Sequence, residues 1–474
     1  MGPARRLSVV DEIFLRTHRR LGTPIALQGL WRTADRVDPE LLRRVHATLR
    51  VGPLGRRVIR PRVPGARRGW RPNTRAHPLE FTDRAIATGD LLEWADEQGA
   101  NLDPEFGPGW RLSTAALADG GSIVSLTCSH ALADGRALVL AVDDALGGPS
   151  LTTPSARVSG SFAKAPAPAA NCPGTGRTVA AAPGRSDTGE PMTSTAGAAD
   201  RSDANAAPAR ESGESTSDWS DAWRQWSIVA RGTVRALRRG IPPRPTRAVP
   251  DREYALSTGG KIAHSVVLQC PAGDWESVAQ AQGGTANSLF IALIAKMLWA
   301  SGFPGATIDA SLPVDTRDEP RVDNDLAMTE LTIERADTPG TIREKARIAY
   351  ERRMSSPGGM PEELLQVIPD RWAHALSRGA GERDMLCSNI GTVPDSLRAL
   401  GPHRCTGVAA RAIHPGLTAN CLPRTRLSGY LCRIADTYTL AIVSLDPAHI
   451  DTPATLRTLA HETTTAFALP VTLW

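Results

Sequence analysis

Residues 148–218 divide this chain of 474 residues into two parts. They consist mostly of Ala, Pro, Gly, Ser, Thr and Asp and include almost no large apolar side chains. Such a composition cannot bury enough apolar surface to offset the entropy lost when a backbone becomes ordered. We therefore predict a disordered insertion or linker between an N-terminal part, residues 1–147, and a C-terminal part, residues 250–474, each of ordinary domain size.

Helix and strand patterns alternate in both parts. Apolar residues recur at helical spacing in some segments and form β-rich runs in others. They predict helices over residues 38–49, 136–146 and 286–299 and strands over 122–128, 307–312, 326–333 and 437–445. Interleaved helices and strands favour α/β layers over an all-β sandwich, and the pattern leaves parallel and antiparallel pairing open.

The segment 219–249 is predicted to connect the two parts through an amphipathic basic helix that ends at Gly240. Trp219, Trp223 and Trp226 are near helical spacing, with arginines among them. Such a helix can pack its aromatic stripe on the parts that it connects, which is the favoured interpretation. Alternatively, it can lie in a membrane interface with its tryptophans at the depth of the headgroups.

The formal net charge is +5, and basic residues are concentrated between Arg43 and Arg75, where seven arginines lie from Arg56 to Arg71. This stretch suggests an anionic partner, such as a membrane surface or the phosphates of coenzyme A. Nucleic acid is not expected as a partner, because no recognition motif accompanies the charge.

The seven cysteines are scattered and never occur in C-x-x-C spacing, which argues against a disulfide framework and a zinc ribbon. No metal site is expected, since the histidines also lack metal-ligand spacing. With no apolar stretch of signal-peptide length, the sequence predicts a cytoplasmic protein, in which peripheral contact with the inner face of a membrane is left open.

The segment from His130 to Gly135, His-Ala-Leu-Ala-Asp-Gly, follows the predicted strand 122–128 directly. A histidine at the mouth of a strand can face a cleft, and a neutral imidazole is suited to act as a general base near neutral pH. Asp134 can either brace the histidine or pair with a cation, and Gly135 allows a sharp turn. On its own the motif is short enough to be incidental.

Together with further motifs in both parts of the chain, this segment indicates a resemblance to a known family. His-x-x-x-Asp-Gly after a strand resembles the chloramphenicol acetyltransferase and condensation-domain superfamily. The chain is most similar to its wax ester synthase/diacylglycerol acyltransferase branch, through Leu7–Leu15, Pro108-Gly-Trp110, Asn287–Ala292, Pro313–Arg317 and Ser388-Asn389-Ile-Gly391. Two positions depart from the branch pattern: Ser129 replaces the first of two histidines, and Ser288 replaces an aspartate.

The resemblance implies an α/β fold with two chloramphenicol-acetyltransferase-like subdomains in a V and an active-site tunnel between them. It implies an acyltransferase in which His130 deprotonates an acceptor hydroxyl or amine that then attacks an acyl thioester. The donor would be acyl-coenzyme A or an acyl carrier protein, with no other cofactor, and transfer to oxygen is favoured over transfer to nitrogen. The acceptor would be a lipid or natural product.

The resemblance also assigns roles to other residues. Asp134 would turn away from the substrate and pair with Arg317 of the C-terminal part; the alternative is that Arg317 is an ordinary solvated arginine. Ser129, Ser388 and Asn389 would line the tunnel. Ser388, Asn389 and the backbone N–H near Gly135 are candidates to stabilise the oxyanion.

Three other function classes are alternatives to acyl transfer. A serine hydrolase is disfavoured, because the chain has no G-x-S-x-G nucleophile elbow, and phosphate-cofactor chemistry is disfavoured by the lack of a P-loop or dinucleotide fingerprint. A non-catalytic condensation-like module that binds an acyl carrier or a lipid is the remaining alternative. Trp110 is predicted to be a packing residue.

Overall fold

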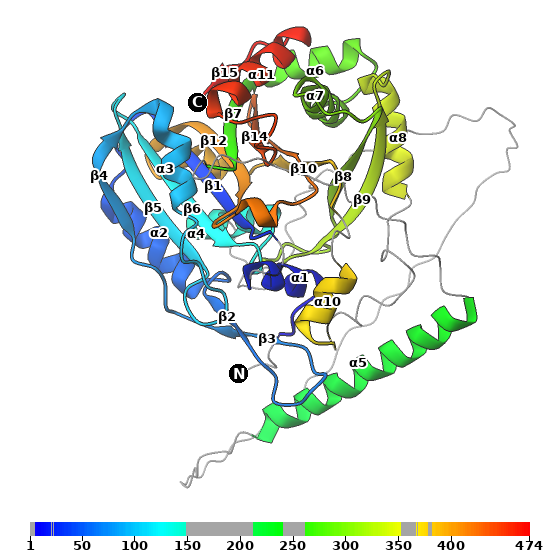
Figure 1. The fold of residues 1–474 in the computed structure, drawn as a ribbon. Helices are drawn as coiled ribbons and strands as arrows, with labels where there is room; N and C mark the ends of the chain where they lie inside the picture. Colours follow the sequence, from blue (N-terminus) through cyan, green and yellow to red (C-terminus); the bar gives the residue numbers. More distant parts are fainter. Residues whose placement is uncertain are drawn as a thin grey trace, which may run out of the picture. The chain divides into compact units, whose positions relative to one another are not determined.

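The structure is built around two large mixed β-sheets (Figure 1). The computed structural model describes residues 5–19, 21, 23–147, 212–239, 261–351, 366, 368–377 and 382–474. All of these except Ser212 belong to one unit of the chain. Most of the predicted insertion, residues 148–211, and the predicted helix end at Gly240 lie outside the described residues.

The first sheet has six strands in the order β11-β12-β1-β6-β5-β4. Its strands are β1 (Ala26–Thr33), β4 (Glu80–Ile86), β5 (Trp110–Leu117), β6 (Ser122–Ser129), β11 (Ala399–Leu400) and β12 (His403–Ile413). A separate hairpin consists of β2 (Arg56–Ile59) and β3 (Gly69–Pro72). The C-terminal part of the chain therefore supplies two strands to the N-terminal sheet, and β12 pairs directly with β1.

The second sheet has seven strands in the order β15-β7-β14-β13-β10-β8-β9. They are β7 (His264–Pro271), β8 (Thr307–Asp315), β9 (Leu326–Glu334), β10 (Met385–Thr392), β13 (Leu427–Ile434), β14 (Thr437–Ser444) and β15 (Thr472–Leu473). β10 pairs in parallel with β8 and β13, whereas the other pairs of this sheet are antiparallel.

Helices cover the sheets and confirm the helical segments predicted from the sequence. They are α1 (Val9–His18), α2 (Pro39–Val51), α3 (Leu91–Glu97), α4 (Gly135–Ala145), α5 (Ser212–Arg239), α6 (Ala272–Ala281), α7 (Ala286–Ala300), α8 (Pro339–Glu351), α10 (Asp370–Ser377) and α11 (Pro453–Ala466). Short 3₁₀ turns occupy Thr88–Asp90, Asp395–Arg398 and Ala419–Cys421. Figure 1 shows α6, α7 and α11 together on one side of the second sheet.

Local sequence explains where the helices begin. Asp38 caps α2 through the backbone N–H of Glu40, and proline occupies the first helical position. Thr285 and Ser288 form a capping box at the start of α7, in which the Ser288 hydroxyl accepts from the Thr285 N–H at 2.7 Å. Ser288 therefore closes the helix start with a neutral hydroxyl.

Buried apolar side chains form one main cluster around each sheet. Trp110, predicted to pack, is 1% exposed and belongs to the first cluster. α7 belongs to the second cluster, where almost all of its side chains are buried. Among the described residues no single helix is long and apolar enough to cross a membrane; only the bent pair α6 and α7 satisfies that criterion by length and composition.

The arginine-rich stretch serves largely as an internal ion-pair network. Arg56 bonds Asp323 at 2.9 Å, Arg67 bonds Asp221 at 2.7 Å, and Arg68 pairs with Glu12 and Asp370. These side chains are at most about a quarter exposed, so their charges are compensated within the protein. The interpretation of this stretch as a site for an anionic partner is therefore wrong for these three arginines, which hold α5, α1, α10 and the segment before β9.

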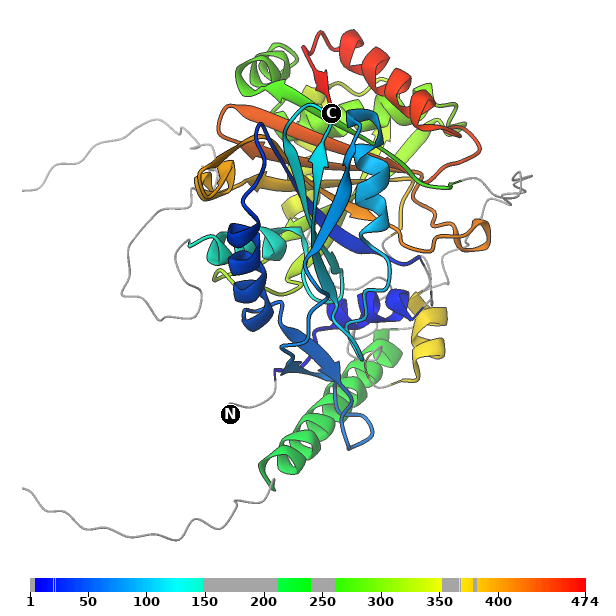
Figure 2. The ribbon, with the colours of Figure 1, turned by 90° about the vertical axis from the view of Figure 1, so that its left-hand side faces the viewer.

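Helix α5 lies beside the β2–β3 hairpin in both ribbon views (Figures 1 and 2). Asp218 accepts from the Arg62 backbone N–H at 2.9 Å, and Asp221 accepts from the Arg67 backbone and guanidinium. This face is buried, whereas a row of tryptophans faces outward: Trp219, Trp223 and Trp226 are 67%, 78% and 52% exposed. The favoured prediction that the aromatic stripe packs on the protein is wrong for Trp219 and Trp223, whereas Trp226 lies against Gly65 between β2 and β3.

We predict that replacing both carboxylates of α5 by Asp218→Ala/Asp221→Ala releases the helix from the hairpin. Each lost carboxylate leaves buried arginine donors unpaired, at a cost of roughly 2 kcal/mol. Trypsin should then cut after Arg224 and Arg231 about tenfold faster or more, as followed by mass spectrometry of the peptides. Ser227→Ala is the control on the same helix and should cleave as the unmodified protein does. Equal cleavage of all three proteins would contradict this docking.

Candidate active site

His130 lies at the end of β6, where the backbone turns out of the first sheet. The Ser129 N–H donates to the Gly109 carbonyl at 2.8 Å, and the His130 N–H donates to the Ile25 carbonyl at 3.3 Å. The next turn is closed by a 2.9 Å bond from the Leu132 N–H to the Ser129 carbonyl. These bonds fix the backbone and place the imidazole, which is only partly buried, at the edge of the sheet.

Asn324, which precedes β9 in the C-terminal part, determines the tautomer of His130. Its Nδ2 donates to the Asp11 carboxylate at 2.9 Å and to the carbonyls of His130 and Ala131 at 2.8 and 3.2 Å. Its Oδ1, which can only accept, therefore faces His130 Nδ1 at 3.2 Å. The proton must be on Nδ1, so Nε2 keeps a lone pair and has no hydrogen-bond partner among the described residues.

The plane of the imidazole is held by a stacked aromatic ring. Phe14 of α1 lies with its ring centroid 3.5 Å from that of His130, at an interplanar angle of 11°. Asp11, which holds Asn324, is on the same helix, where it also closes a capping box with Ser8. One short helix thus supplies both the stacking ring and the carboxylate behind the amide.

Burial lowers the pKa of His130 to about 4. Removal from water disfavours the charged imidazolium. Bonds from the ring to its own backbone carbonyl and to Asn324, together with the Asp134 carboxylate, act in the opposite direction but do not offset the burial. His130 is therefore a neutral base at neutral pH.

Asp134 does not contact the imidazole and instead joins the two parts of the chain. Its Oδ1 caps α4 by accepting from the Ala137 N–H at 2.9 Å. Its Oδ2 accepts from Arg317 at 2.5 Å and from the Asp325 N–H at 3.0 Å. Both side chains are about 5% exposed, so the pair is buried, and burial raises the pKa of Asp134 although Arg317 opposes the rise. The structure thus brings together the two residues predicted to pair, and the alternative of a solvated Arg317 is wrong.

A second arginine braces the same loop. Arg56 donates to the Leu132 carbonyl at 2.6 Å and to Asp323 at 2.9 Å, and its guanidinium lies 4.4 Å from the ring centre of Trp70. Asp323 immediately precedes Asn324. The segment between β8 and β9 therefore bonds to the His130–Asp134 loop at several points.

Gly135 lies close to β10. It is the first residue of α4 and is not among the glycines with positive φ, so it does not use the left-handed backbone region. A Cβ on Gly135 would lie 2.7 Å from the Ile390 side chain of β10. Arg136 also donates to the Thr392 carbonyl at 3.0 Å, so the end of β10 lies against the start of α4.

The three residues predicted to line a tunnel occupy different surroundings. Ser129 is buried, and its hydroxyl accepts weakly from the Ala131 N–H at 3.4 Å. Ser388 is partly buried and Asn389 exposed on β10, close to the Ile390 contact with Gly135. The Asn389 amide donates to Asn287 at 3.0 Å and accepts from the Gly391 N–H at 2.9 Å. Their roles remain predictions.

Sequence reasoning missed Asn324, Asp11, Phe14 and Arg56. Asp11 and Phe14 lie within the Leu7–Leu15 motif that carried part of the family resemblance. The motif marked this segment, but the sequence did not indicate what either side chain does. Asn324 lies in an ordinary polar stretch, and only the fold brings it to His130. Among the described residues no group of three or more His, Cys, Asp or Glu side chains is arranged to hold a metal.

Comparison with known proteins supports the fold. No family model and no curated sequence matches the chain. The first condensation domain of the CDA synthetase matches with a TM-score of 0.55 at 13% identity, over 100% of this chain and 99% of that one. The chain has the two-lobed fold of condensation domains. The predicted α/β class with two lobes is therefore confirmed.

Two other structures extend this likeness of the condensation-domain fold. The wax ester synthase/diacylglycerol acyltransferase from Marinobacter aquaeolei matches with a TM-score of 0.52 at 13% identity, over 98% of this chain and 100% of that one. Polyketide synthase associated protein 5 from Mycobacterium tuberculosis matches with a TM-score of 0.51 at 13% identity, over 98% and 100%.

We predict that His130 makes the protein less stable in acid. Its pKa is about 4 in the folded state and near 6.5 when unfolded, so between these values the unfolded chain binds more protons and the free energy of unfolding rises with pH. Across this window His130 contributes up to about 3 kcal/mol of pH dependence. His130→Asn keeps a donor toward Asn324 but cannot titrate, so urea unfolding from pH 4 to pH 7 should show a smaller slope. An identical slope in both proteins would refute the shift.

Proposed function

We propose that the protein transfers an acyl group from a thioester to an acceptor hydroxyl or amine, with His130 as the general base. The observation that carries this proposal is the tautomer of His130. Nδ1–H is directed at the Asn324 Oδ1 at 3.2 Å, so the lone pair of Nε2 is available to take a proton. The condensation-domain fold and its likeness to a wax ester synthase/diacylglycerol acyltransferase support acyl transfer as the reaction class.

In the proposed step, the acceptor gives its proton to Nε2 while its oxygen or nitrogen attacks the thioester carbonyl. The tetrahedral oxyanion then collapses, the carbon–sulfur bond breaks, and the thiolate takes the proton back from the imidazolium. A depressed pKa makes this imidazolium a strong acid relative to a thiol, whose pKa is roughly 8.5. Burial thus makes abstraction of the proton harder and its return to the leaving group easier.

Asp134 has a positioning role in this proposal. Both of its oxygens already accept bonds, from the Ala137 N–H, the Arg317 guanidinium and the Asp325 N–H. A carboxylate whose two oxygens are both engaged in this way is not placed to accept a proton from the substrate. It holds the loop that orients His130, and Arg317 neutralises it.

The oxyanion needs donors that are not already engaged. The Asn389 amide is bonded to Asn287, and the Ala137 N–H is bonded to Asp134. We therefore favour the Ser388 hydroxyl and the backbone N–H near Gly135 as donors, because β10 and the start of α4 meet there.

The donor is proposed to be acyl-coenzyme A or an acyl carrier protein, and the acceptor a hydroxyl of a lipid or natural product in preference to an amine. The fold likeness to a polyketide synthase associated protein and to a condensation domain supports a carrier-bound donor as well as free acyl-coenzyme A. Mass spectrometry of products, after incubation with a panel of acyl thioesters and alcohols or amines, would identify both substrates.

We predict that His130→Ala lowers turnover of the identified substrates by about a hundredfold or more, the range of general-base catalysis. The change opens space at the edge of the sheet and should leave the circular dichroism spectrum unchanged. His461→Ala, on the exposed surface of α11, is the matched control and should retain full turnover. A folded His130→Ala protein with normal turnover would show that His130 is not the base. An absence of turnover with every thioester tested would favour the non-catalytic binding module.

We further propose that the exposed tryptophan row of α5 contacts anionic membranes. Three tryptophans facing outward beside the exposed Arg224 are the composition of an interfacial helix. Cosedimentation with vesicles of phosphatidylglycerol and phosphatidylcholine should therefore capture the protein, and Trp219→Ser/Trp223→Ser should abolish capture. Trp372→Ser, which removes a 70% exposed tryptophan from α10, is the control. Failure of the unmodified protein to sediment would end this proposal.

A further inference from the structure

Two carboxylates lie near His130, and they differ in how they are linked to its ring. Asp134 follows His130 in the same loop, but both of its oxygens are engaged by α4 and by the C-terminal part. Asp11 of α1 lies behind Asn324, and hydrogen bonds connect it through that amide to the imidazole. Of the two carboxylates, Asp11 is therefore the one that a chain of hydrogen bonds, the Asp11–Asn324–His130 chain, joins to the ring.

Each step of the Asp11–Asn324–His130 chain has one donor and one acceptor. His130 Nδ1–H is directed at Asn324 Oδ1 at 3.2 Å, and Asn324 Nδ2 donates to Asp11 Oδ1 at 2.9 Å. The other oxygen of Asp11 accepts from the Ser8 N–H at 2.8 Å. Hydrogen bonds in such a chain polarise one another, so a negative charge on the carboxylate makes Asn324 Oδ1 a stronger acceptor.

The hydrogen-bond partners of Asp11 fit its ionised form. Burial raises the pKa of this carboxyl group, whereas the bonds from Ser8 and Asn324 and the charge of Arg56 oppose the rise. Both oxygens accept from N–H donors, and no described residue offers an acceptor to a proton on either of them. A protonated Asp11 would therefore bury an unpaired O–H donor, which is unfavourable.

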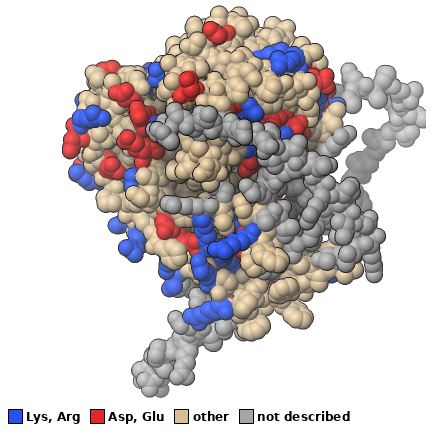
Figure 3. Space-filling view, viewed as in Figure 1, with Lys and Arg blue, Asp and Glu red and all other residues tan. Residues whose placement is uncertain are grey.

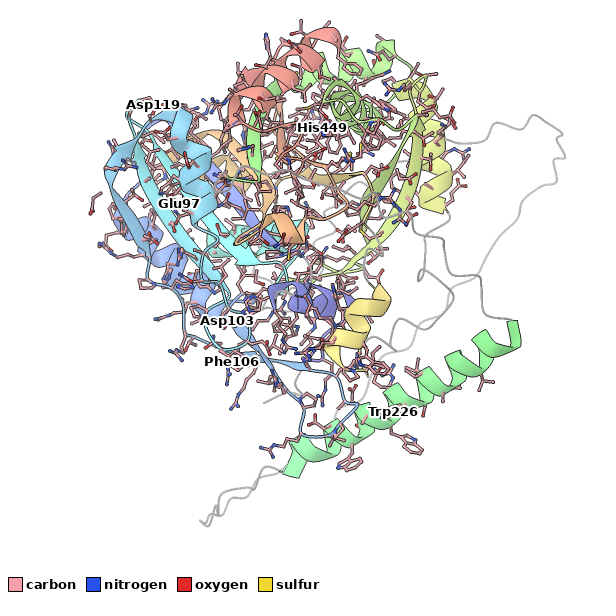
Figure 4. All side chains as sticks on the ribbon, in the orientation of Figure 1. Glu97, Asp103, Phe106, Asp119, Trp226 and His449 are labelled. Carbon is pink, nitrogen blue, oxygen red and sulfur yellow. The ribbon has the colours of Figure 1, made fainter. Side chains whose placement is uncertain are left out.

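Ion pairs fix the end of α1 against its neighbours. Arg19, which follows the helix, pairs with Glu105 at 2.5 Å and with Asp370 of α10. Figure 3 shows acidic and basic side chains next to each other on this part of the surface. His18 of the last turn lies 3.5 Å from Asp103, which is labelled in Figure 4. Because a capping box also closes the start of the helix, α1 is fixed at both ends and holds its buried carboxylate in place.

The other charged and titratable groups near this chain are compensated or neutral. Arg56 and Asp323 act on Asp11 with opposite signs and pair with each other at 2.9 Å. Asp134 acts on the imidazole but is held in its buried ion pair with the C-terminal part. Burial lowers the pKa of His414, which follows β12, to about 4, so this ring is neutral at neutral pH. Asp11 is thus the charge near the base that has no ion-pair partner among the described residues.

We propose that Asp11 is a positioning residue that stabilises the imidazolium of His130 through Asn324. In the proposed acyl transfer, on which this role rests, the acceptor gives its proton to Nε2 and the thiolate later takes it back. While the proton is on Nε2 the ring is positively charged, and its Nδ1–H makes a stronger bond to Asn324 Oδ1. The Asp11 carboxylate attracts this charged ring and not the neutral one, so it favours the transfer step over substrate binding. No proton moves along the chain.

Asp11→Asn tests this role, because it keeps the size of the side chain and removes the charge. In the full chain with isotope-labelled histidines, the His130 signals in nuclear magnetic resonance spectra are those that His130→Asn removes. Their titration from about pH 7 to about pH 4.5 should show that Asp11→Asn lowers the pKa of His130 by about one pH unit, with Nδ1 still protonated. With the substrates identified, kcat should fall about tenfold, the same factor, while KM stays unchanged. Asp83→Asn removes an exposed charge from β4 and should change neither the pKa nor kcat.

Asn324→Ser interrupts the chain at its centre and should also lower both the pKa of His130 and kcat. The double variant Asp11→Asn/Asn324→Ser should lose no more kcat than the less active single variant, because both side chains act through one chain. Separate structural roles would make the two losses multiply. Asn324→Ser by itself tests the chain where Asp11→Asn does not fold.

An unchanged pKa of His130 in Asp11→Asn, an unchanged kcat, or losses that multiply in the double variant would overturn the inference. The pKa is measured without substrate, so it is independent of turnover. A pKa that responds to Asp11→Asn in a protein that turns over no thioester would support the chain and refute the acyl transfer. Turnover that depends on His130 but does not respond to Asp11→Asn would refute the role of Asp11 alone.

Discussion

The bonds between the His130–Asp134 loop and the segment between β8 and β9 are the constraint on which the rest of the site depends. Arg317 bonds Asp134, and Asn324 bonds His130 through both ends of its amide. The residues of these two pairs are 183 and 194 positions apart in the sequence. Removing one member of such a buried ion pair typically costs about 3–5 kcal/mol, because the other charge is left unpaired. The same bonds therefore orient His130 and hold the two lobes together.

The imidazole itself is controlled by burial and by the identity of its acceptor. An amide oxygen at Nδ1 fixes the tautomer without adding a negative charge, in contrast to a carboxylate, which would raise the pKa. The negative charge lies one bond farther away, on Asp11, behind the Asn324 amide. The ring consequently stays neutral, and Phe14 fixes its plane. Such a base is suited to a reaction that ends by returning the proton to a leaving group.

Several arginines of the protein form ion pairs with its own carboxylates. Arg56, Arg67 and Arg68 each pair with carboxylates from distant segments, and Arg411, fully buried in the first sheet, pairs with Asp96. Net charge alone therefore does not show which charges are available to a partner, because ion pairs within the protein compensate many of them.

The sequence by itself determined the local elements and the position of His130 after a strand. These follow from apolar spacing, capping residues and a short motif, all of which act over a few neighbouring residues. It also indicated the pairing of Asp134 with Arg317, through resemblance. Only the tertiary structure decided that β12 joins the N-terminal sheet and that Asn324 and Asp11 set the tautomer of His130. Those contacts link residues far apart in the chain, and no local pattern records them.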